Sequence, residues 1–220
     1  MSAGELMKIE AKHDWVETLR GIGQNRTVQS SESVFYQGET LTTIGLIISG
    51  TAQAVVHSED GQETWVGEFG PGEFFGHSAI LGEGSLNMTI TAATELRFLS
   101  IAISKFDAAL ANESALSTAL AQDLARRLHF ITQRLVEAIT LTSPGRVCAE
   151  LIRLSKPIGI EPDKSIVRPN PIFTQLASRI SSTRETVSRT VSSLQKKGII
   201  SREPGAILIH KPDVLRKQIK

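Results

Sequence analysis

The chain has 220 residues, of which 40% are hydrophobic and 21% charged, an ordinary composition for a soluble globular protein. This length suffices for one large domain or two modest ones, and no segment approaches the roughly 20 apolar residues of a transmembrane helix. The single cysteine, Cys148, excludes an internal disulfide and any four-cysteine zinc or iron–sulfur site. The N-terminus lacks the apolar core of a signal peptide, so the expected compartment is the cytoplasm.

The net charge of +1 hides an uneven distribution along the chain. Residues 1–142 carry 9 Lys+Arg and 17 Asp+Glu, a net charge of −8, whereas residues 143–220 carry 15 and 6, a net charge of +9. This asymmetry favours a basic module that binds a polyanion, joined to an acidic module with another task. Two ordinary domains with a chance imbalance are the alternative.

From about Val28 to Ile103 the sequence has the pattern of short strands separated by turns. The runs TIGLIISG, TAQAVVH and ETWVGEFG are typical of strands, and Asp60-Gly61 between two of them is typical of a hairpin turn. Glycines recur at turn-like intervals through this region. Many short strands with glycine turns predict a small barrel or jelly roll.

From about Lys105 the apolar period changes to that of a helix, and it is sustained over more than six turns. The apolar stripe consists of Leu116, Leu120, Leu124, Leu128, Ile131, Leu135 and Ile139. A helix of roughly 40 Å exceeds what a barrel of about 80 residues covers, so we expect part of the stripe to pack on a second helix. The simplest partner is its own copy in a twofold dimer, and the alternative is a helix buried wholly against its own chain.

The segment after this helix is predicted to change the direction of the chain. Residues 142–146, TSPGR, form the expected hinge, because proline and glycine end helices. The run RVCAELIRLS then predicts a short amphipathic helix. Residues 156–171, with four prolines, predict a loop that leaves room for brief strand pairing.

Residues 173–198 have the pattern of two helices joined by a tight turn. Thr174 is predicted to cap a first helix that runs to Ile180. Ser181-Ser182 is predicted to make the turn, and Thr183 to cap the second helix.

The second helix, which is expected to run to about Lys197, is predicted to have two different faces. Val187, Val191 and Leu194 share an inner, apolar face. A polar face lies roughly 130° away at 100° per residue. That outer face consists of Arg184, Glu185, Ser188, Arg189 and Ser192. A short helix, a tight turn and a helix with a polar basic outer face form the helix-turn-helix pattern.

The residue types on this outer face have the chemistry of base recognition. An arginine guanidinium can pair with guanine O6 and N7, and a carboxylate can accept a hydrogen bond from cytosine N4. Because phosphates would repel Glu185, its place between Arg184 and Arg189 favours base reading over generic adhesion. The following run, GIISREPGAILIH, predicts a two-strand wing turned at Pro204-Gly205. The candidate phosphate contacts are Lys196, Lys197, Arg202 and Lys211.

These motifs resemble the CRP/FNR transcription regulators, the family of the cyclic-AMP receptor protein. TRETVSR is similar to the recognition-helix motif of the cyclic-AMP branch, and YQGE, IISG and DGQETWVGEFGPGEFFG are similar to the sensor barrel. QDLARRLHFITQRL resembles the dimer helix, and TSPGRVCAELIRLS resembles the hinge and first helix of the DNA domain. The resemblance spans about residues 28–212. It implies an α+β fold with an N-terminal β-roll (a jelly roll like that of cyclic-nucleotide-binding domains) over residues 1–108, a long dimerisation helix over 109–142 and a C-terminal winged helix-turn-helix over 143–220.

The resemblance also implies how the chain would bind DNA. It implies a homodimer whose recognition helices enter successive major grooves about 34 Å apart. It implies half-sites resembling TGTGA, with Arg184 and Arg189 on guanines and Glu185 on a cytosine. The expected partners are a palindromic double-stranded DNA, a second copy of the chain, and RNA polymerase. The predicted DNA-binding residues are Ser182, Thr183, Arg184, Glu185, Ser188, Arg189, Lys196, Lys197 and Arg202.

The stretch FFGHSAILGEGSLNMT, residues 74–89, corresponds to the ligand cassette of the cyclic-nucleotide-binding members. The resemblance places His77 at a glutamate that binds the ribose 2′-hydroxyl, and Leu86-Asn87 at an Arg-Ser pair that binds the cyclic phosphate. A charge-assisted hydrogen bond contributes roughly 1.5–3 kcal/mol, so losing the arginine should weaken nucleotide binding by about one to two orders of magnitude. The candidate pocket residues are Gly76, His77, Ser78, Leu86, Asn87, Met88, Ile131 and Thr132.

The effector is therefore open on the sequence alone. Control by cyclic AMP or cyclic GMP is one alternative, since a cationic His77 or backbone N–H groups around Gly82–Gly84 could partly replace the arginine. Haem bound through His77, with His129 nearby in sequence, is a second, and an unidentified ligand or none is a third. The absence of N-terminal cysteines excludes the iron–sulfur chemistry of one branch of the family.

Two other function classes are less well supported. A module whose basic part binds protein or RNA would not need Glu185 between two arginines. The chain has no Walker loop, no H-E-x-x-H and no G-x-S-x-G elbow, so we predict neither an enzyme nor a metal site.

Overall fold

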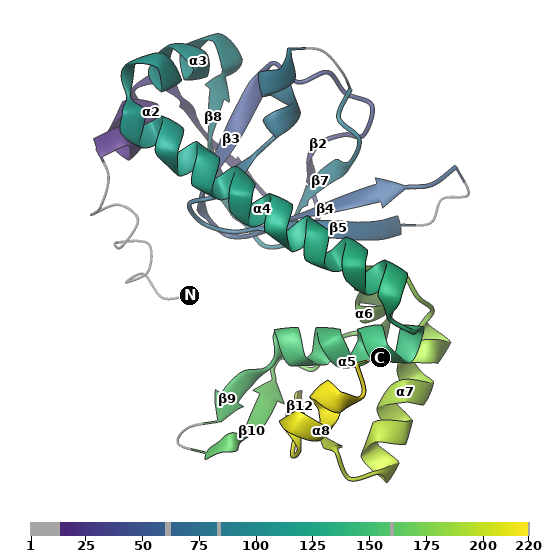
Figure 1. Cartoon of the computed structure of the whole chain (residues 1–220). Helices are drawn as coiled ribbons and strands as arrows, with labels where there is room; N and C mark the ends of the chain where they lie inside the picture. Colours follow the sequence, from purple (N-terminus) through teal and green to yellow (C-terminus); the bar gives the residue numbers. More distant parts are fainter. Residues whose placement is uncertain (1–13, 60–62, 83–84, 159–160, 220) are drawn as a thin grey trace. The chain divides into compact units, whose positions relative to one another are not determined.

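The computed structural model describes residues 14–59, 63–82, 85–158 and 161–219 (Figure 1). The chain forms two compact units, one up to His129 and one from Phe130, and the long helix α4 (Ser114–Thr140) contributes residues to both. In the described ranges, none of the helices is long and apolar enough to cross a membrane.

Within the described residues, the N-terminal unit is built on two four-stranded antiparallel sheets. Their strand orders are β1-β8-β3-β6 and β2-β7-β4-β5. The strands are β1 (Gln24–Val28), β2 (Ser33–Phe35), β3 (Thr43–Ser49), β4 (Ala52–His57), β5 (Glu63–Phe69), β6 (Phe74–Phe75), β7 (Thr89–Ala92) and β8 (Leu96–Ala102). The N-terminal β domain predicted from the alternating runs is confirmed. The turn predicted at Asp60-Gly61 lies outside the described residues, and β4 and β5 on either side pair antiparallel.

The strand β3 is buried on both faces, because one face meets the other sheet and the opposite face meets helices. Ile47 belongs to the apolar cluster between the sheets, whereas Ile44 and Leu46 belong to the cluster beneath the helices. Gly45 shares the face of Ile47, and a Cβ added there would lie 2.2 Å from the ring of Phe75. Only glycine therefore allows this ring to fill the core. The covering helices are α2 (Asp14–Ile22), α3 (Ile103–Asn112) and the first turns of α4.

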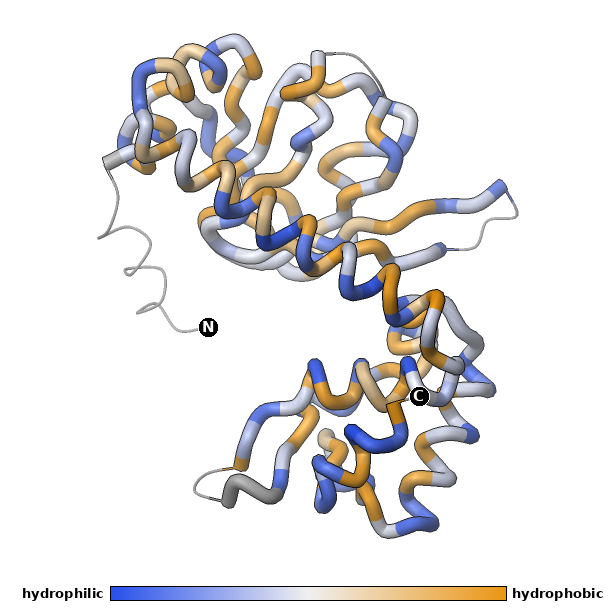
Figure 2. The backbone as a smooth tube through the Cα atoms, in the orientation of Figure 1, coloured by the Kyte–Doolittle hydropathy of each residue, from blue (hydrophilic) through white to orange (hydrophobic). Residues whose placement is uncertain are grey.

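The apolar stripe predicted on the long helix divides into a buried and an exposed part. The helical region predicted from about Lys105 is interrupted at Glu113, between α3 and α4. Leu116 and Leu120 are 0% and 8% exposed and pack in the cluster beneath the helices. Figure 2 shows apolar positions continuing along α4 to its end. From Leu124 to Ile139 the stripe residues are 40–74% exposed, so the described chain does not bury this part of the stripe.

The C-terminal unit contains a helix-turn-helix and a small antiparallel sheet, as the sequence predicted. The strand order among the described residues is β11-β12-β10-β9. The strands and helices are α5 (Ser143–Leu154), β9 (Lys156–Ile158), β10 (Glu161–Val167), α6 (Phe173–Arg179), α7 (Arg184–Lys196), β11 (Ile200–Glu203), β12 (Ala206–Ile209) and α8 (Pro212–Lys217). One apolar cluster joins these elements, with Val147, Leu176, Val191 and Ile207 at most 1% exposed.

One local prediction in this unit is wrong, and a second is only partly right. The hinge predicted at residues 142–146 is the start of α5, because Thr142 caps that helix and accepts a hydrogen bond from Gly145 N at 3.3 Å. Pro144 lies in the first turn, where a missing N–H costs nothing. Residues 156–171, predicted as a loop with room for brief strand pairing, contain the whole of β9 and β10, and Pro157 is tolerated because β9 is an edge strand.

The cap predicted at Thr174 is also wrong. α6 begins at Phe173, and the carbonyl of Ile172 accepts the first helical hydrogen bond from Leu176 N at 2.9 Å. Thr174 lies within the first turn and is exposed. The cap residue Ile172 forms no side-chain hydrogen bond, so the sequence signal for a polar cap has no counterpart in the structure.

Candidate nucleic-acid interface and sensor site

The turn between α6 and α7 is short and closed by backbone hydrogen bonds. Ser182 N donates to Ala177 O at 3.0 Å, and Ser181 has a φ of +48°. A left-handed residue of this kind reverses the chain within two positions. The Thr183 hydroxyl then accepts a hydrogen bond from Thr186 N at 3.2 Å, so Thr183 is the N-cap that the sequence predicted.

The two faces of α7 are those that the helical spacing predicted. Val187, Val191 and Leu194 are at most 3% exposed and pack in the core of the C-terminal unit. Ser188, expected on the outer face, is half-buried. The remaining outer-face side chains are exposed, namely Arg184, Glu185, Arg189 and Ser192. The apolar face therefore anchors the helix, while the polar face is free to meet a partner.

Glu185 lies in the first turn of α7 and is held in its charged form. Hydrogen bonds from its backbone N–H and from the Thr183 hydroxyl, followed by the charges of Arg184 and Arg189, lower the pKa of this carboxyl. The positive end of the helix dipole acts in the same direction. At neutral pH Glu185 is therefore a hydrogen-bond acceptor, as recognition of a cytosine amino group requires.

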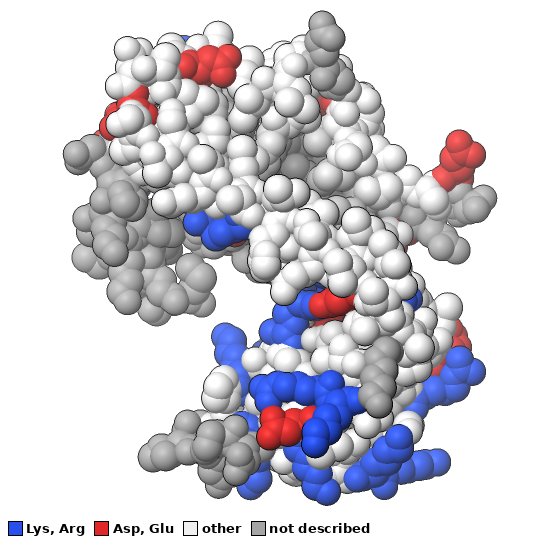
Figure 3. All heavy atoms as spheres, viewed as in Figure 1, with Lys and Arg blue, Asp and Glu red and all other residues white. Residues whose placement is uncertain are grey.

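Basic side chains surround α7 and the wing formed by β11 and β12. The wing turns at Pro204-Gly205, where Gly205 has a φ of +73°. The guanidinium of Arg202 lies 5.1 Å from the ring centroid of Phe173, which steadies this exposed cation. Figure 3 shows Lys and Arg gathered over the C-terminal unit in the face drawn. The lysines predicted to contact phosphates are all exposed, namely Lys196, Lys197 and Lys211.

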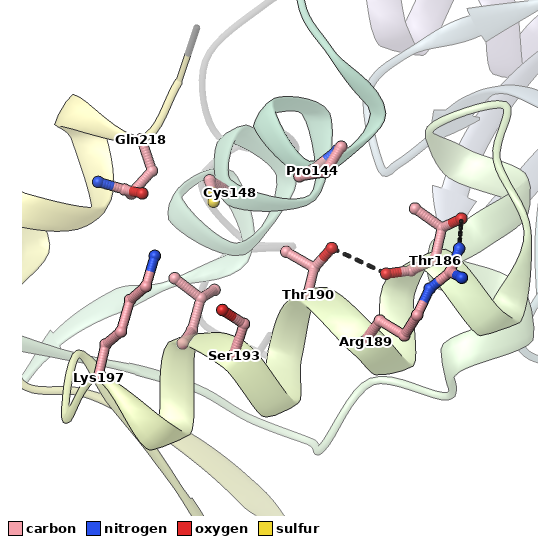
Figure 4. A pocket seen from close by; sticks show the side chains of 9 residues that line it. Pro144, Cys148, Thr186, Arg189, Thr190, Ser193, Lys197 and Gln218 are labelled. Carbon is pink, nitrogen blue, oxygen red and sulfur yellow. Dashed lines mark hydrogen bonds between the residues drawn. The ribbon is translucent and has the colours of Figure 1, made fainter.

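A cavity of about 270 Å³ lies between α5, α7 and the end of α8 (Figure 4). Arg189 lines it, and the Arg189 guanidinium lies 3.4 Å from the Thr186 hydroxyl. Cys148 also lines it, and desolvation raises the pKa of this thiol to about 11 despite the opposing charge of Lys197. The thiol is therefore protonated at neutral pH and is a poor nucleophile. The sequence did not predict this cavity, because its walls come from helices far apart in the chain.

The sensor stretch begins with β6 and continues as the 3₁₀ helix η1 (His77–Leu81). Gly76 precedes η1 with a φ of +81°, and an added Cβ there would lie 3.1 Å from the Phe35 ring. Leu86 is 4% exposed and belongs to the core cluster between the sheets, whereas Asn87 is exposed. The position matched to the phosphate-binding arginine is thus part of the apolar core. Residues 83–84, part of the segment expected to offer backbone donors, lie outside the described residues.

His77 is engaged by a carboxylate from the long helix. Its Nε2 atom lies 3.3 Å from Oδ2 of Asp123. Asp123 is 2% exposed and lies 3.6 Å from the guanidinium of Arg126. The contact joins η1 to α4 within the N-terminal unit, at the place predicted to hold an effector.

Arg127 brings a half-buried cation to the same part of α4. Its guanidinium carbon lies 3.8 Å from the ring centroid of Phe69, and one of its nitrogens lies 3.7 Å from Oε2 of Glu73. Burial lowers the pKa of Arg127, and the charges of Glu73 and Asp123 oppose that effect. Among the described residues its Nε atom has no hydrogen-bond partner.

Sequence reasoning missed both Asp123 and Arg127. The available signal was their spacing, since Leu116, Leu120, Asp123 and Arg127 lie at intervals of four, three and four residues and so share one face of α4. The remaining predicted pocket residues on this helix, Ile131 and Thr132, belong to the C-terminal unit and are exposed.

Two family models match the chain. The model of the cyclic nucleotide-binding domain matches residues 25–113, and that of the Crp-like helix-turn-helix domain matches residues 145–218. The CRP-like cAMP-activated global transcriptional regulator of Mycobacterium tuberculosis is 28% identical over 190 residues, which cover 86% of this chain and 84% of that protein.

Solved structures share the fold. The c-di-GMP responsive global regulator CLP of Xanthomonas campestris aligns with a TM-score of 0.77 and 21% identity, covering 89% of this chain and 97% of that one. A CooA variant of Carboxydothermus hydrogenoformans aligns with a TM-score of 0.81 and 15% identity, covering 98% and 95%. At these identities the likeness concerns the fold.

Proposed function

The chain belongs to the CRP/FNR family of transcription regulators, and on this premise we propose that it acts as a homodimer that reads TGTGA-like half-sites through α7. Residues 1–108 would be the sensor, 109–142 the dimerisation helix and 143–220 the DNA-binding domain. The family consists of DNA-binding regulators rather than enzymes. Contact with RNA polymerase is part of the proposal.

The outer face of α7 is the observation that carries this proposal. Arg184 and Arg189 present exposed guanidinium groups, and the ionised Glu185 lies in the same first turns. Two arginines and a glutamate would pair with two guanines and a cytosine, bases that the two G·C pairs of a TGTGA half-site supply. The exposed lysines and Arg202 would contact the phosphates on either side.

The exposed half of the apolar stripe supports the homodimer. Leu128, Ile131, Leu135 and Ile139 are 47–74% exposed along one helix. Exposing a row of large apolar side chains to water is unfavourable. Burying each of them would stabilise the dimer by about 1.5–3 kcal/mol. A second copy offers the identical stripe, so a twofold helix pair would bury both at once.

Binding to designed duplexes tests the DNA-reading part of the proposal. We expect the purified protein to bind a TGTGA-type palindrome at least about 10³-fold more tightly than random duplex at physiological salt, because base contacts add to the phosphate contacts. Fluorescence anisotropy with labelled duplexes would measure the two dissociation constants. Equal affinity for both duplexes, or preference for a structured RNA competitor, would instead favour the alternative of a generic polyanion-binding module.

The sensor is proposed to differ from that of cyclic-AMP-activated relatives. Leu86 lies in the apolar core, and His77 contacts Asp123, so neither side chain supplies the ribose and phosphate contacts of those relatives. A haem bound through His77 would compete with Asp123 for the Nε2 atom. As the first candidate, we therefore propose either an effector that is not a cyclic nucleotide, or control without an effector.

A cyclic nucleotide held differently is the second candidate, and two observations favour it. The cyclic nucleotide-binding domain model matches residues 25–113, and the relative from Mycobacterium tuberculosis is named as cAMP-activated. In addition, the half-buried guanidinium of Arg127 could compensate a phosphate from the helix side.

Titration with nucleotides separates these candidates. We expect cyclic AMP and cyclic GMP at about 1 mM to change the affinity for the palindrome by less than about twofold, because the loop arginine worth one to two orders of magnitude is absent. Isothermal titration calorimetry and anisotropy would measure binding and its effect, and a visible absorption spectrum would detect haem. Micromolar binding that is lost in Arg127→Met would contradict the first candidate and establish the second.

A further inference from the structure

Glu150 is a fully buried carboxylate that faces three guanidinium groups. It lies on α5 and is 0% exposed. Arg134 Nη1 donates to its Oε2 atom at 2.5 Å, and Arg153 Nη1 donates to the same oxygen. Arg179 Nη1 lies 3.7 Å from the other oxygen, Oε1. Burying a carboxylate without such partners would destabilise the fold by several kcal/mol. Pairing with these arginines offsets that cost.

The groups around Glu150 come from three different helices. Arg134 and Glu137 lie on the last turns of α4, Arg153 lies on α5 beside Glu150, and Arg179 ends α6. Arg153 Nη2 also pairs with Glu137 Oε1, which closes a second link between α4 and α5. We call these five residues, Arg134, Glu137, Glu150, Arg153 and Arg179, the interhelix clamp. All five belong to the C-terminal unit.

The clamp reaches the first helix of the helix-turn-helix directly. Arg134 Nη2 donates to the backbone carbonyl of Arg179, so one guanidinium from α4 holds both the α5 carboxylate and the end of α6. Arg146 reinforces this joint, since it donates to Leu141 O at 3.0 Å and to Ile180 O at 2.9 Å. A planar guanidinium with two fixed acceptors leaves little freedom for rotation.

We propose that the interhelix clamp sets the direction of the last turns of α4 relative to the helix-turn-helix, and thereby the spacing of the two recognition helices in the dimer. The inference rests on the proposed homodimer, in which the α4 stripes of two copies pair. Leu135 lies one position after Arg134, so the dimer contact and the clamp occupy the same turn of α4. A rotation at this joint would move both α7 helices away from the grooves one helical turn apart.

If the clamp only stabilised the fold, its loss would not change which half-site spacing the protein prefers. The preference for one half-site spacing is therefore the quantity to measure. Duplexes with TGTGA half-site centres 8, 10 and 12 bp apart, and one isolated half-site, would be titrated by anisotropy. We expect the unsubstituted protein to prefer 10 bp by at least about tenfold. Arg134→Met removes the direct link from α4 to Glu150 and to the end of α6. The Arg153–Glu137 pair still joins α4 to α5, and Glu150 stays paired with Arg153 and Arg179, so the domain should fold. Glu150→Gln, which removes the central charge, is the second variant.

The expected result is that both variants reduce the spacing ratio to about twofold while binding the isolated half-site within about twofold of the unsubstituted protein. Arg216→Met is the matched control, because it removes an exposed arginine paired only locally with Asp213, and it should keep the tenfold ratio. The proposed role of the clamp would be overturned if both variants kept the unsubstituted spacing ratio, or if they lost affinity equally for all duplexes. If the unsubstituted protein itself shows no spacing preference, the proposed dimeric reading fails together with the clamp, a result distinguishable from failure of the clamp alone.

Discussion

Leu135→Asp is expected to convert the proposed homodimer into monomers. Leu135 is 57% exposed on α4, and a twofold helix pair would bury it twice, at about 1.5–3 kcal/mol for each copy. The substitution also places two carboxylates in the contact, and an unpaired buried charge costs several kcal/mol more. The dissociation constant of the dimer should therefore rise by at least about 10³-fold. Sedimentation velocity across a concentration series would measure it.

Leu81→Asp is the control for this prediction. Leu81 is 77% exposed in η1 and lies outside the proposed dimer helix, so this variant should remain dimeric. Loss of dimers should be accompanied by loss of palindrome binding, because a monomer holds only one half-site. A Leu135→Asp protein that stays dimeric at micromolar concentration would show that α4 is not the dimer contact.

Arg184→Ala and Arg189→Ala should each weaken binding to the cognate palindrome by about 1–3 kcal/mol per contacted base pair and relax specificity at that position. The physical reason is that a bidentate guanidinium–guanine pair is lost, while the apolar face formed by Val187 and Val191 still anchors α7. Competition against duplexes substituted one base at a time would measure both effects.

Lys196→Ala provides the contrast, because a phosphate contact carries no sequence information. It should weaken binding to cognate and random duplexes alike and reduce the salt slope by about one. Base reading by α7 would be refuted if Arg184→Ala and Arg189→Ala also lowered both affinities by the same factor. Glu185→Ala should relax the preference at the cytosine, since the carboxylate is its acceptor.

Several features of the fold are predictable from the sequence because they depend on neighbours in the chain. The stripe on α4, the cap at Thr183 and the turn at Ser181-Ser182 are local, and each follows from spacing or from the conformational preference of one residue. The buried face of α7 follows equally from 3.6-residue periodicity. The charge asymmetry needs only a count of ionisable residues, and that count suffices to place the basic module in residues 143–220.

The local predictions that are wrong share one cause. Pro144 and Gly145 are typical of a helix end, yet proline is equally acceptable in a first turn, where Thr142 supplies the cap. Thr174 has the right residue type for a cap, but the helix begins one residue earlier, with Ile172 as its cap. A short segment can contain residue types that fit two different helix boundaries. Packing against the rest of the unit selects the boundary that forms.

The remaining features depend on contacts between distant residues, which no local pattern specifies. His77 and Asp123 are 46 residues apart, and Arg134 and Arg179 are 45 apart. These residue types are common in a polar sequence, and nothing in the local pattern marks them. Their pairing follows from the burial of the partner carboxylates Asp123 and Glu150, because a charge removed from water must find a partner. Residue spacing and composition therefore sufficed for the basic module, the stripe on α4 and the two faces of α7, whereas the family followed from the resemblance of whole motifs to known regulators. The carboxylate that holds His77, the cation at Phe69 and the clamp around Glu150 follow from the tertiary packing that removes these groups from water.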